Sequence, residues 1–333
     1  MDPPLLSSPL LSFHGNAWMD AWRTTTHEVC GGCRLAVHEY ANDDTAPHVT
    51  VLLLHATGFH ARAYEVIAAK LVRECRARVV APDLPFHGET AVLNDGVERA
   101  DALYSWQNIA DRVVAPLCDA LRLDERGVVV FGHSMGGAVG HRLAEIRPRV
   151  VRSLVAFEPI IRQDVEVETV ELRVAFEAQR DILSSTAQRR KNSPHETVQG
   201  AFEAHRGRAI FAAWHDDCLL AYVKYGFHWE TAVQSLRGTL LCEPANEARM
   251  YQGGPIHVHP TNVHCPVMML MGGLRRAQRP ECISAEKYCV RTESSLVIMP
   301  NASHFGPFED PNAICECVRR SAMQSYQMCN SKL

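Results

Sequence analysis

The sequence lacks any apolar run that approaches the roughly 18 residues needed for a membrane-spanning helix. It also lacks an excess of one charge: Lys and Arg number 34, Asp and Glu number 38, and the net charge is −4. Because the two signs are well mixed, the chain has no basic patch that would attract a nucleic acid or an anionic membrane. We therefore expect no nucleic-acid partner and no membrane span.

The N-terminus lacks the features of a signal peptide. The first residues are MDPPLLSSPLLSF. They include a few leucines, but they contain no basic n-region and no long apolar h-region. The twelve cysteines do not form a disulfide framework, and several lie in segments with the pattern of a helix or strand, such as Cys75, Cys118 and Cys265. Reduced, buried thiols are typical of the cytosol. We expect a cytoplasmic protein whose residues 1–30 form a loose arm.

Metal-ligand sets with suitable spacing are also missing. The pair Cys30 and Cys33 has C-x-x-C spacing, but zinc would require a second such pair, and Cys315 and Cys317 stand too close together. A glycine turn before a strand explains the first pair more simply. A solvated loop is the better interpretation of three neighbouring histidines, His257, His259 and His264. We expect neither a metal nor a cofactor.

The most informative stretch that is present runs from Val128 to Gly137. Four apolar residues are followed directly by Gly132-His133-Ser134-Met135-Gly136, and a small, apolar, helix-like segment comes next. This order predicts a strand, a sharp turn and a helix, with G-x-S-x-G in the turn. The glycines permit the close approach of neighbouring backbone, and the helix N-terminus favours negative charge beside the serine. We interpret Ser134 as a nucleophile.

Apolar strand-like segments alternate with helix-like ones along most of the chain. We expect strands at residues 34–40, 48–55, 78–82, 128–131, 151–157, 266–271 and 295–299. The helices are expected at residues 61–75, 105–123 and 311–328, with a kink at Pro116 in the second. Such alternation predicts the α/β class, with a mostly parallel central sheet that carries helices on both faces.

The pattern changes between Ile160 and Val263, where helical stretches dominate. We expect a core in two parts, residues 31–159 and 264–333, and a helical cap insertion at 160–263. The insertion is rich in aromatic side chains, most of which should form its own core, with one or two lining an apolar substrate pocket: Trp214, Tyr222, Tyr225, Phe227 and Trp229.

Sites in parallel sheets lie at the carboxyl ends of the strands. Thr57, Asp83 and Ser134 each follow a predicted strand, so we expect them in one neighbourhood. Asp83 is expected to be a structural turn residue.

Together these motifs resemble the α/β-hydrolase fold family, and its capped esterase-like members in particular. The resemblance covers about residues 35 to 330 and includes a loop, two turns and a late histidine: His55-Ala56-Thr57-Gly58, Asp83-Leu84-Pro85-Phe86-His87-Gly88, Gly132–Gly137 and Ser303-His304-Phe305-Gly306-Pro307. It implies that Ser134 attacks an acyl carbon and that His304 takes its proton. It also implies that the N–H groups of Thr57 and Met135 bind the oxyanion.

The chain departs from the family at the acid that should orient His304. After the strand at 266–271 the family has a carboxylate, but here the first acid is Glu281, preceded by several arginines, which cannot accept a hydrogen bond. Some members place the acid one strand earlier, where this chain has Glu158. We predict Glu158 as the acid and keep Glu281 as the alternative.

The predicted function is a cofactor-independent serine hydrolase that acts on a small-molecule acyl substrate, most simply a carboxylic ester. Hydrolysis of a carbon–carbon bond by the same serine and histidine is one alternative. A non-catalytic, ligand-binding protein of the same fold is another. Neither the substrate nor an oligomeric state can be assigned from the sequence.

Overall fold

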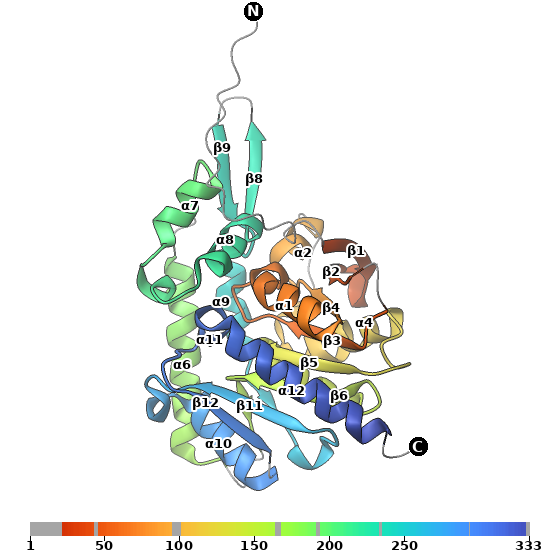
Figure 1. The fold of residues 1–333 in the computed structure, drawn as a ribbon. Coiled ribbons are helices and arrows are strands. Elements are labelled where there is room, and N and C mark those ends of the chain that lie inside the picture. Colours follow the sequence, from red (N-terminus) through yellow and green to blue (C-terminus); the bar gives the residue numbers. More distant parts are fainter. Residues whose placement is uncertain are drawn as a thin grey trace, which may run out of the picture.

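The computed structural model describes residues 22–42, 46–94, 101–163, 168–190, 194–232, 235–292 and 294–330. Its centre is an eight-stranded sheet in the order β1-β2-β4-β3-β5-β6-β11-β12 (Figure 1). The strands are β1 (Trp22–Glu28), β2 (Arg34–Tyr40), β3 (Val49–Leu54), β4 (Ala77–Pro82), β5 (Val128–His133), β6 (Val151–Phe157), β11 (Val267–Gly272) and β12 (Ser295–Met299). Only β2 pairs antiparallel with its neighbours β1 and β4, and the other neighbouring strands of this sheet are parallel. The predicted α/β class and mostly parallel sheet are confirmed.

Helices cover both faces of the sheet. On one face lie α1 (Glu65–Cys75) and α12 (Pro311–Asn330), and on the other lie α4 (Ala115–Ala120), α5 (Met135–Ile146) and α10 (Pro280–Thr292). Side chains of a strand alternate between the faces, so Leu52 packs with the core beneath α5 and Leu53 with the core beneath α1. Each fully buried leucine of this kind contributes about 1.5–3 kcal/mol. The sheet is therefore held from both sides and fixes the positions of its strand ends.

The helix predicted from Ser105 to Leu123 is less regular than its pattern suggests. It begins with α3 (Trp106–Asn108), capped by the Ser105 side chain, and continues as the π-helical segment η4 (Ile109–Val114) before α4. The Ala115 N–H bonds to the Ala110 carbonyl, five residues earlier. This wide turn ends just before Pro116, whose missing N–H disfavours a continuous α-helix.

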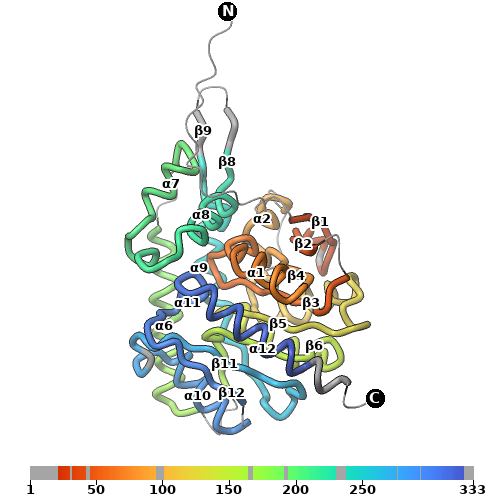
Figure 2. Tube along the Cα trace, viewed as in Figure 1, coloured from red at the N-terminus to blue at the C-terminus, as the bar shows by residue number. Residues whose placement is uncertain are grey.

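Residues 160–263 leave the sheet after β6 and return before β11. They contain α6 (Val170–Arg189), α7 (Val198–His205), α8 (Asp216–Tyr225), α9 (Pro244–Gln252), and the short strands β7 (Ile161–Arg162) and β10 (Ile256–His257). β7 pairs in parallel with β10, so the two ends of this segment are joined. Figure 2 shows α6 running beside α10 and α9, with which it packs.

This segment also contains a hairpin that the sequence did not predict. β8 (Phe227–Ala232) pairs antiparallel with β9 (Ser235–Leu240), and the hairpin projects away from the sheet beside α7 (Figure 1). Short hairpins that are partly open to solvent mix polar and apolar residues, so they give no apolar run of the kind that marks the core strands.

The N-terminal segment differs in part from the expected loose arm. Residues 22–28 form β1, which pairs with β2 from Trp22 opposite Tyr40 to Glu28 opposite Arg34. The Trp22 and Tyr40 rings stack with centroids 5.4 Å apart, which anchors this edge strand. Residues 1–21 lie outside the described part of the chain.

Cysteines in the described residues are free thiols, and most are buried. The segment Cys30–Gly32 forms a single 3-10 turn between β1 and β2, as predicted, with Gly32 at a φ of 72°. No helix in the described part of the chain is both long and apolar enough to cross a membrane.

Candidate active site

Ser134 occupies the sharp turn between β5 and α5. Its φ of 52° and ψ of −114° are an uncommon conformation for a residue with a side chain, and such strain costs about 1–3 kcal/mol. The turn requires small neighbours, since a Cβ on Gly136 would lie 2.1 Å from the Leu54 carbonyl oxygen and one on Gly132 would lie 2.4 Å from the Gly136 carbonyl oxygen. The glycines of the motif are therefore needed sterically, as predicted.

The loop after β3 reaches the same turn. In this loop the N–H groups of Ala56, Gly58 and Phe59 donate to the Tyr64 hydroxyl, the His87 ring and the Ala56 carbonyl. The Thr57 N–H has no such partner among the described residues. The Thr57 hydroxyl contacts the Met135 sulfur at 3.3 Å, so the two residues are adjacent. Met135 is the first residue of α5, where N–H groups lack partners within the helix.

Asp83 binds the chain next to this loop through hydrogen bonds to its buried carboxylate. Its buried carboxylate accepts hydrogen bonds from the N–H groups of Ala61 at 2.7 Å and Glu89 at 2.7 Å, and it pairs with the His38 Nε2 at 3.0 Å. Burial by itself would raise the pKa of Asp83, but the neighbouring histidines, His38 foremost, hold that pKa well below its usual range. Asp83 thus acts as a structural anchor, as its position in the sequence suggested.

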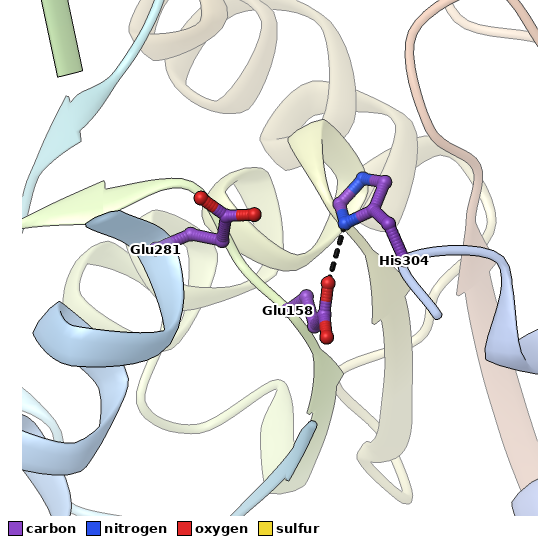
Figure 3. A group of neighbouring side chains, drawn as sticks. All are labelled: Glu158, Glu281 and His304. Carbon is purple, nitrogen blue, oxygen red and sulfur yellow. Dashed lines mark hydrogen bonds and ion pairs between the residues drawn. The ribbon is translucent and has the colours of Figure 1, made fainter. Parts of the chain in front are cut away.

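Glu158 and His304 meet at the carboxyl end of the sheet (Figure 3). Glu158 follows β6 directly and is fully buried, and its Oε2 lies 2.6 Å from the His304 Nδ1. The positive φ of 44° at Glu158 marks a sharp change of chain direction at the end of the strand. The Gly272 N–H, at the end of β11, donates to Oε1 at 2.8 Å. The sequence-predicted pair therefore lies within hydrogen-bond distance.

Arg279 is a further partner of Glu158 that the sequence analysis missed. One guanidinium nitrogen donates to the Glu158 carboxylate, and the other donates to the Gly272 carbonyl at 2.7 Å. A buried carboxylate normally needs a cation or several hydrogen-bond donors. This requirement was the only signal in the sequence that could have pointed to Arg279. The arginine-rich stretch after β11 thus supplies a cation to the buried carboxylate at the end of the neighbouring strand β6.

Glu281 lies beside this pair without bonding to the histidine. It is buried, and its Oε2 accepts a hydrogen bond from the Gln179 side chain of α6 at 2.8 Å. Glu158, Glu281 and His304 bring potential metal-ligand atoms within 4.8 Å of one another (Figure 3). However, the Glu158 Oε2 is already shared by His304 and the Arg279 cation, so this set fits a hydrogen-bonded acid–histidine pair better than a cation site.

The charges around His304 favour its protonated form. Partial burial by itself would lower the pKa of His304, but the hydrogen bond and charge of Glu158, aided by Glu281, raise this pKa above the ordinary 6.5. A histidine in this setting can accept a proton readily at neutral pH.

Ser134 and His304 both line one cavity of about 350 Å³. Its wall is mainly apolar and includes side chains from the core and the insertion: Phe59, Trp106, Ile160, Phe176 and Phe305. Gln179, Arg180 and Glu281 add a polar side. No hydrogen bond joins the Ser134 hydroxyl to the His304 ring within the described residues, as is common before substrate binds.

Three of the five aromatic residues singled out in the insertion, Trp214, Tyr222 and Phe227, are buried in a core as expected, but none takes the expected place in the pocket wall. Trp214, for example, is buried and stacks on Phe308 with ring centroids 4.1 Å apart. None of the five lines the cavity that contains Ser134, and the aromatic wall comes from other elements. Sequence composition identified an aromatic cluster but could not show which way it faces.

Comparison with known proteins shows the family to which the chain belongs. Residues 51–316 match the model of the alpha/beta hydrolase family. The chain belongs to this family. Sequence relatives include protein phosphatase methylesterase 1 of Rattus norvegicus, which is 35% identical over 89 residues, or 27% of this chain and 22% of the relative. Lipase LipV of Mycobacterium tuberculosis is 35% identical over 117 residues, or 34% of this chain and 38% of the lipase. The matches therefore span well under half the length of these curated relatives.

Solved structures with the same fold match nearly the whole chain. The peroxisomal alpha-beta-hydrolase Lpx1 from Saccharomyces cerevisiae aligns with a TM-score of 0.67 and 17% identity, covering 93% of this chain and 91% of that one. E-2-(Acetamidomethylene)succinate hydrolase aligns with a TM-score of 0.63 and 20% identity, covering 90% and 98% of the two chains. At such identities the similarity establishes the fold alone.

Proposed function

We propose that the protein is a serine hydrolase that cleaves a small or medium acyl compound, most simply a carboxylic ester, through an acyl-enzyme. The observation that carries the proposal is the shared cavity. Ser134 and His304 both face it, and the His304 Nδ1 lies 2.6 Å from the Glu158 carboxylate behind it. A nucleophile, a base and a group that orients the base are the three parts of such a catalyst.

The first half of the reaction would form the acyl-enzyme. The Ser134 Oγ attacks the ester carbonyl carbon while the His304 Nε2 takes the hydroxyl proton. Glu158 accepts the Nδ1–H, which fixes the required tautomer and stabilises the imidazolium that forms. The negative oxygen of the tetrahedral intermediate accepts hydrogen bonds from the N–H groups of Thr57 and Met135. His304 then gives its proton to the departing alcohol.

The second half would release the acid. A water molecule gives a proton to the His304 Nε2 and attacks the acyl carbon, and the Ser134 Oγ leaves with that proton. The same two N–H groups stabilise the second oxyanion. Every proton in this scheme moves between the substrate, water, Ser134 and His304, so neither half requires a cofactor or a metal.

The size and lining of the cavity support an apolar acyl group of small or medium length. Its volume of about 350 Å³ falls at the lower end of the range for small-molecule pockets, about 300–1,000 Å³. Phe176 of α6 and Ile210 contribute to the wall, so residues 160–263 would act as the cap on a core formed by 31–159 and 264–333. The free thiols support a cytoplasmic location as part of the proposal.

A series of p-nitrophenyl esters, from acetate to dodecanoate, tests the proposal. We expect the wild type to hydrolyse the shorter esters, and the Ser134→Ala and His304→Ala variants to lose at least about 10³-fold in kcat. Folded wild-type protein that hydrolyses none of them would contradict the ester-hydrolase proposal. A measurable affinity for the intact esters without turnover would favour the non-catalytic, ligand-binding alternative.

A further inference from the structure

Three segments of the site meet at one buried side chain, His133, the residue before Ser134. Its Nδ1 lies 2.8 Å from the Tyr64 hydroxyl, and its Nε2 lies 2.8 Å from the backbone carbonyl oxygen of His304. The Tyr64 hydroxyl oxygen in turn lies 3.2 Å from the backbone nitrogen of Ala56, which belongs to the loop that carries Thr57. The serine turn, the loop after β3 and the segment of His304 are thus joined by three consecutive hydrogen bonds.

The direction of each hydrogen bond follows from the groups at the two ends. A backbone carbonyl only accepts, so the His133 Nε2 must carry a proton and donate to His304. Burial, the nearby His304 and the apolar surroundings keep His133 neutral, since its pKa lies well below the ordinary value. The Nδ1 is then an acceptor, the Tyr64 hydroxyl donates to it, and the Tyr64 oxygen accepts from the Ala56 N–H.

Water cannot replace these bonds. His133 and Tyr64 are both 0% exposed. The Tyr64 ring packs against the Phe308 ring with centroids 4.8 Å apart. The His133 ring packs between Phe308 and Phe157, with centroid distances of 6.0 and 5.5 Å. In such an interior a lost partner leaves an unsatisfied polar group, so the neighbouring backbone must shift to find another.

We propose that His133 and Tyr64 are positioning residues that fix the backbone of His304 relative to the loop of Thr57. This inference rests on the proposed function, because it concerns the distance between the base and the oxyanion donors. His304 is held at two points: Glu158 bonds its ring, and His133 bonds its carbonyl. Ala56, the residue before Thr57, donates its N–H to the Tyr64 hydroxyl. Removing the Tyr64 hydroxyl should loosen both loops at once.

The variant Tyr64→Phe tests the proposal with little change in shape. It keeps the packed ring, removes the donor to His133 and removes the acceptor of the Ala56 N–H. His133→Gln is the second variant. The matched control is His141→Gln, because His141 is also 0% exposed and lies on α5. It donates from Nδ1 to the Gly137 carbonyl at 3.1 Å and makes no hydrogen bond to either loop among the described residues.

Four quantities are to be measured for each variant: kcat and KM for p-nitrophenyl butyrate, the melting temperature, and the far-downfield proton resonance of the His304 Nδ1–H. A displacement of about 1 Å can cost about 100-fold in rate. We expect Tyr64→Phe and His133→Gln to lower kcat about 10- to 100-fold, to leave KM within about threefold, and to shift or broaden the His304 resonance. His141→Gln should lower the melting temperature but keep kcat and the resonance.

The outcomes separate this inference from the proposed function. An active wild type whose Tyr64→Phe variant keeps both its kcat and its His304 resonance would overturn the positioning role alone. The same holds if His141→Gln loses as much kcat as Tyr64→Phe, since general destabilisation would then explain both. A wild type that hydrolyses no ester would overturn the proposed function and, with it, a catalytic role for the positioning.

Discussion

Glu158 and His304 form a hydrogen bond of 2.6 Å although 146 positions separate them in the chain. The carboxylate projects from the end of β6, and the histidine follows β12, two strands further along the sheet. The intervening strand β11 ends at Gly272, which contributes a backbone N–H to Glu158 and no side chain. The candidate site thus takes its carboxylate from one side of β11 and its histidine from the other.

The first prediction concerns the acid. We expect Glu158→Gln to lower kcat/KM by about 10²–10⁴-fold, because a neutral amide neither stabilises the imidazolium nor fixes the His304 tautomer. Glu281→Gln is the matched control, since it is also a buried glutamate beside the histidine, and it should lose less than about tenfold. Steady-state kinetics distinguish the two. A larger loss for Glu281→Gln would assign the acid to Glu281.

The second prediction concerns pH. The proposed mechanism requires unprotonated His304, so kcat/KM should fall as the pH drops through the pKa of this residue. Partial burial lowers that pKa but Glu158 raises it more, so the falling limb should be centred above the ordinary 6.5. In Glu158→Gln the burial remains and the carboxylate charge is lost, so the limb should move to lower pH. A wild-type limb below 6.5, or an unchanged limb in the variant, would contradict the account.

The third prediction concerns the serine turn. We expect Gly136→Ala to lower the melting temperature strongly, or to prevent folding, because the new Cβ would lie 2.1 Å from the Leu54 carbonyl oxygen. The matched control is Gly200→Ala on α7, where the nearest atom to the Cβ is the Thr197 side-chain oxygen at 3.2 Å. Alanine should be tolerated there, since it favours a helix over glycine by about 1 kcal/mol. Equal melting temperatures for the two variants would contradict the close approach of Gly136 to Leu54 at the turn.

The fourth prediction concerns the anchor beneath the loop of Thr57. Asp83→Asn should lower the free energy of unfolding by about 3–5 kcal/mol at pH 7, because it removes the charge partner of buried His38. The pKa of Asp83 is lower in the folded protein than in the unfolded chain, where it is about 3.9. Ionised Asp83 therefore stabilises the folded protein above about pH 3.9, and this stabilisation is lost as the pH falls below that value.

Urea unfolding at pH 7 measures this difference. Asp119→Asn is the control, because Asp119 is 52% exposed and pairs with Arg147 at the surface, where an ion pair contributes less than about 1 kcal/mol. A wild type no more stable than Asp83→Asn at pH 7 would show that the anchor contributes nothing.

Much of the fold follows from local sequence signals. The strands at 34–40 and 151–157 were predicted with the bounds they have. The second is a buried parallel strand, an apolar run that ends at a charged residue and a proline. The first pairs antiparallel and follows a glycine turn. The β8–β9 hairpin was missed, because its two segments mix polar and apolar residues and contain no such run. The π-helical segment before Pro116 was predicted only as a kink, since the hydrogen-bond pattern depends on the packing of the helix.

The candidate site was predictable to the extent that its residues follow strands. Ser134, Thr57 and Glu158 each do, and parallel strands bring their carboxyl ends to one edge. Arg279 was not identified, because its partner lies on a different strand and no local pattern connects the two. The same holds for Tyr64 and His133, whose hydrogen bonds join three loops that only the folded chain brings together.

The central claim is that Ser134 is a nucleophile activated by His304 and Glu158. The most direct measurement is labelling of the purified protein with a fluorophosphonate, followed by mass spectrometry of the modified peptide. We expect covalent modification of Ser134, none in Ser134→Ala, and a much slower rate in His304→Ala and Glu158→Gln. A folded wild type that stays unmodified, or is modified at another residue, would contradict the claim.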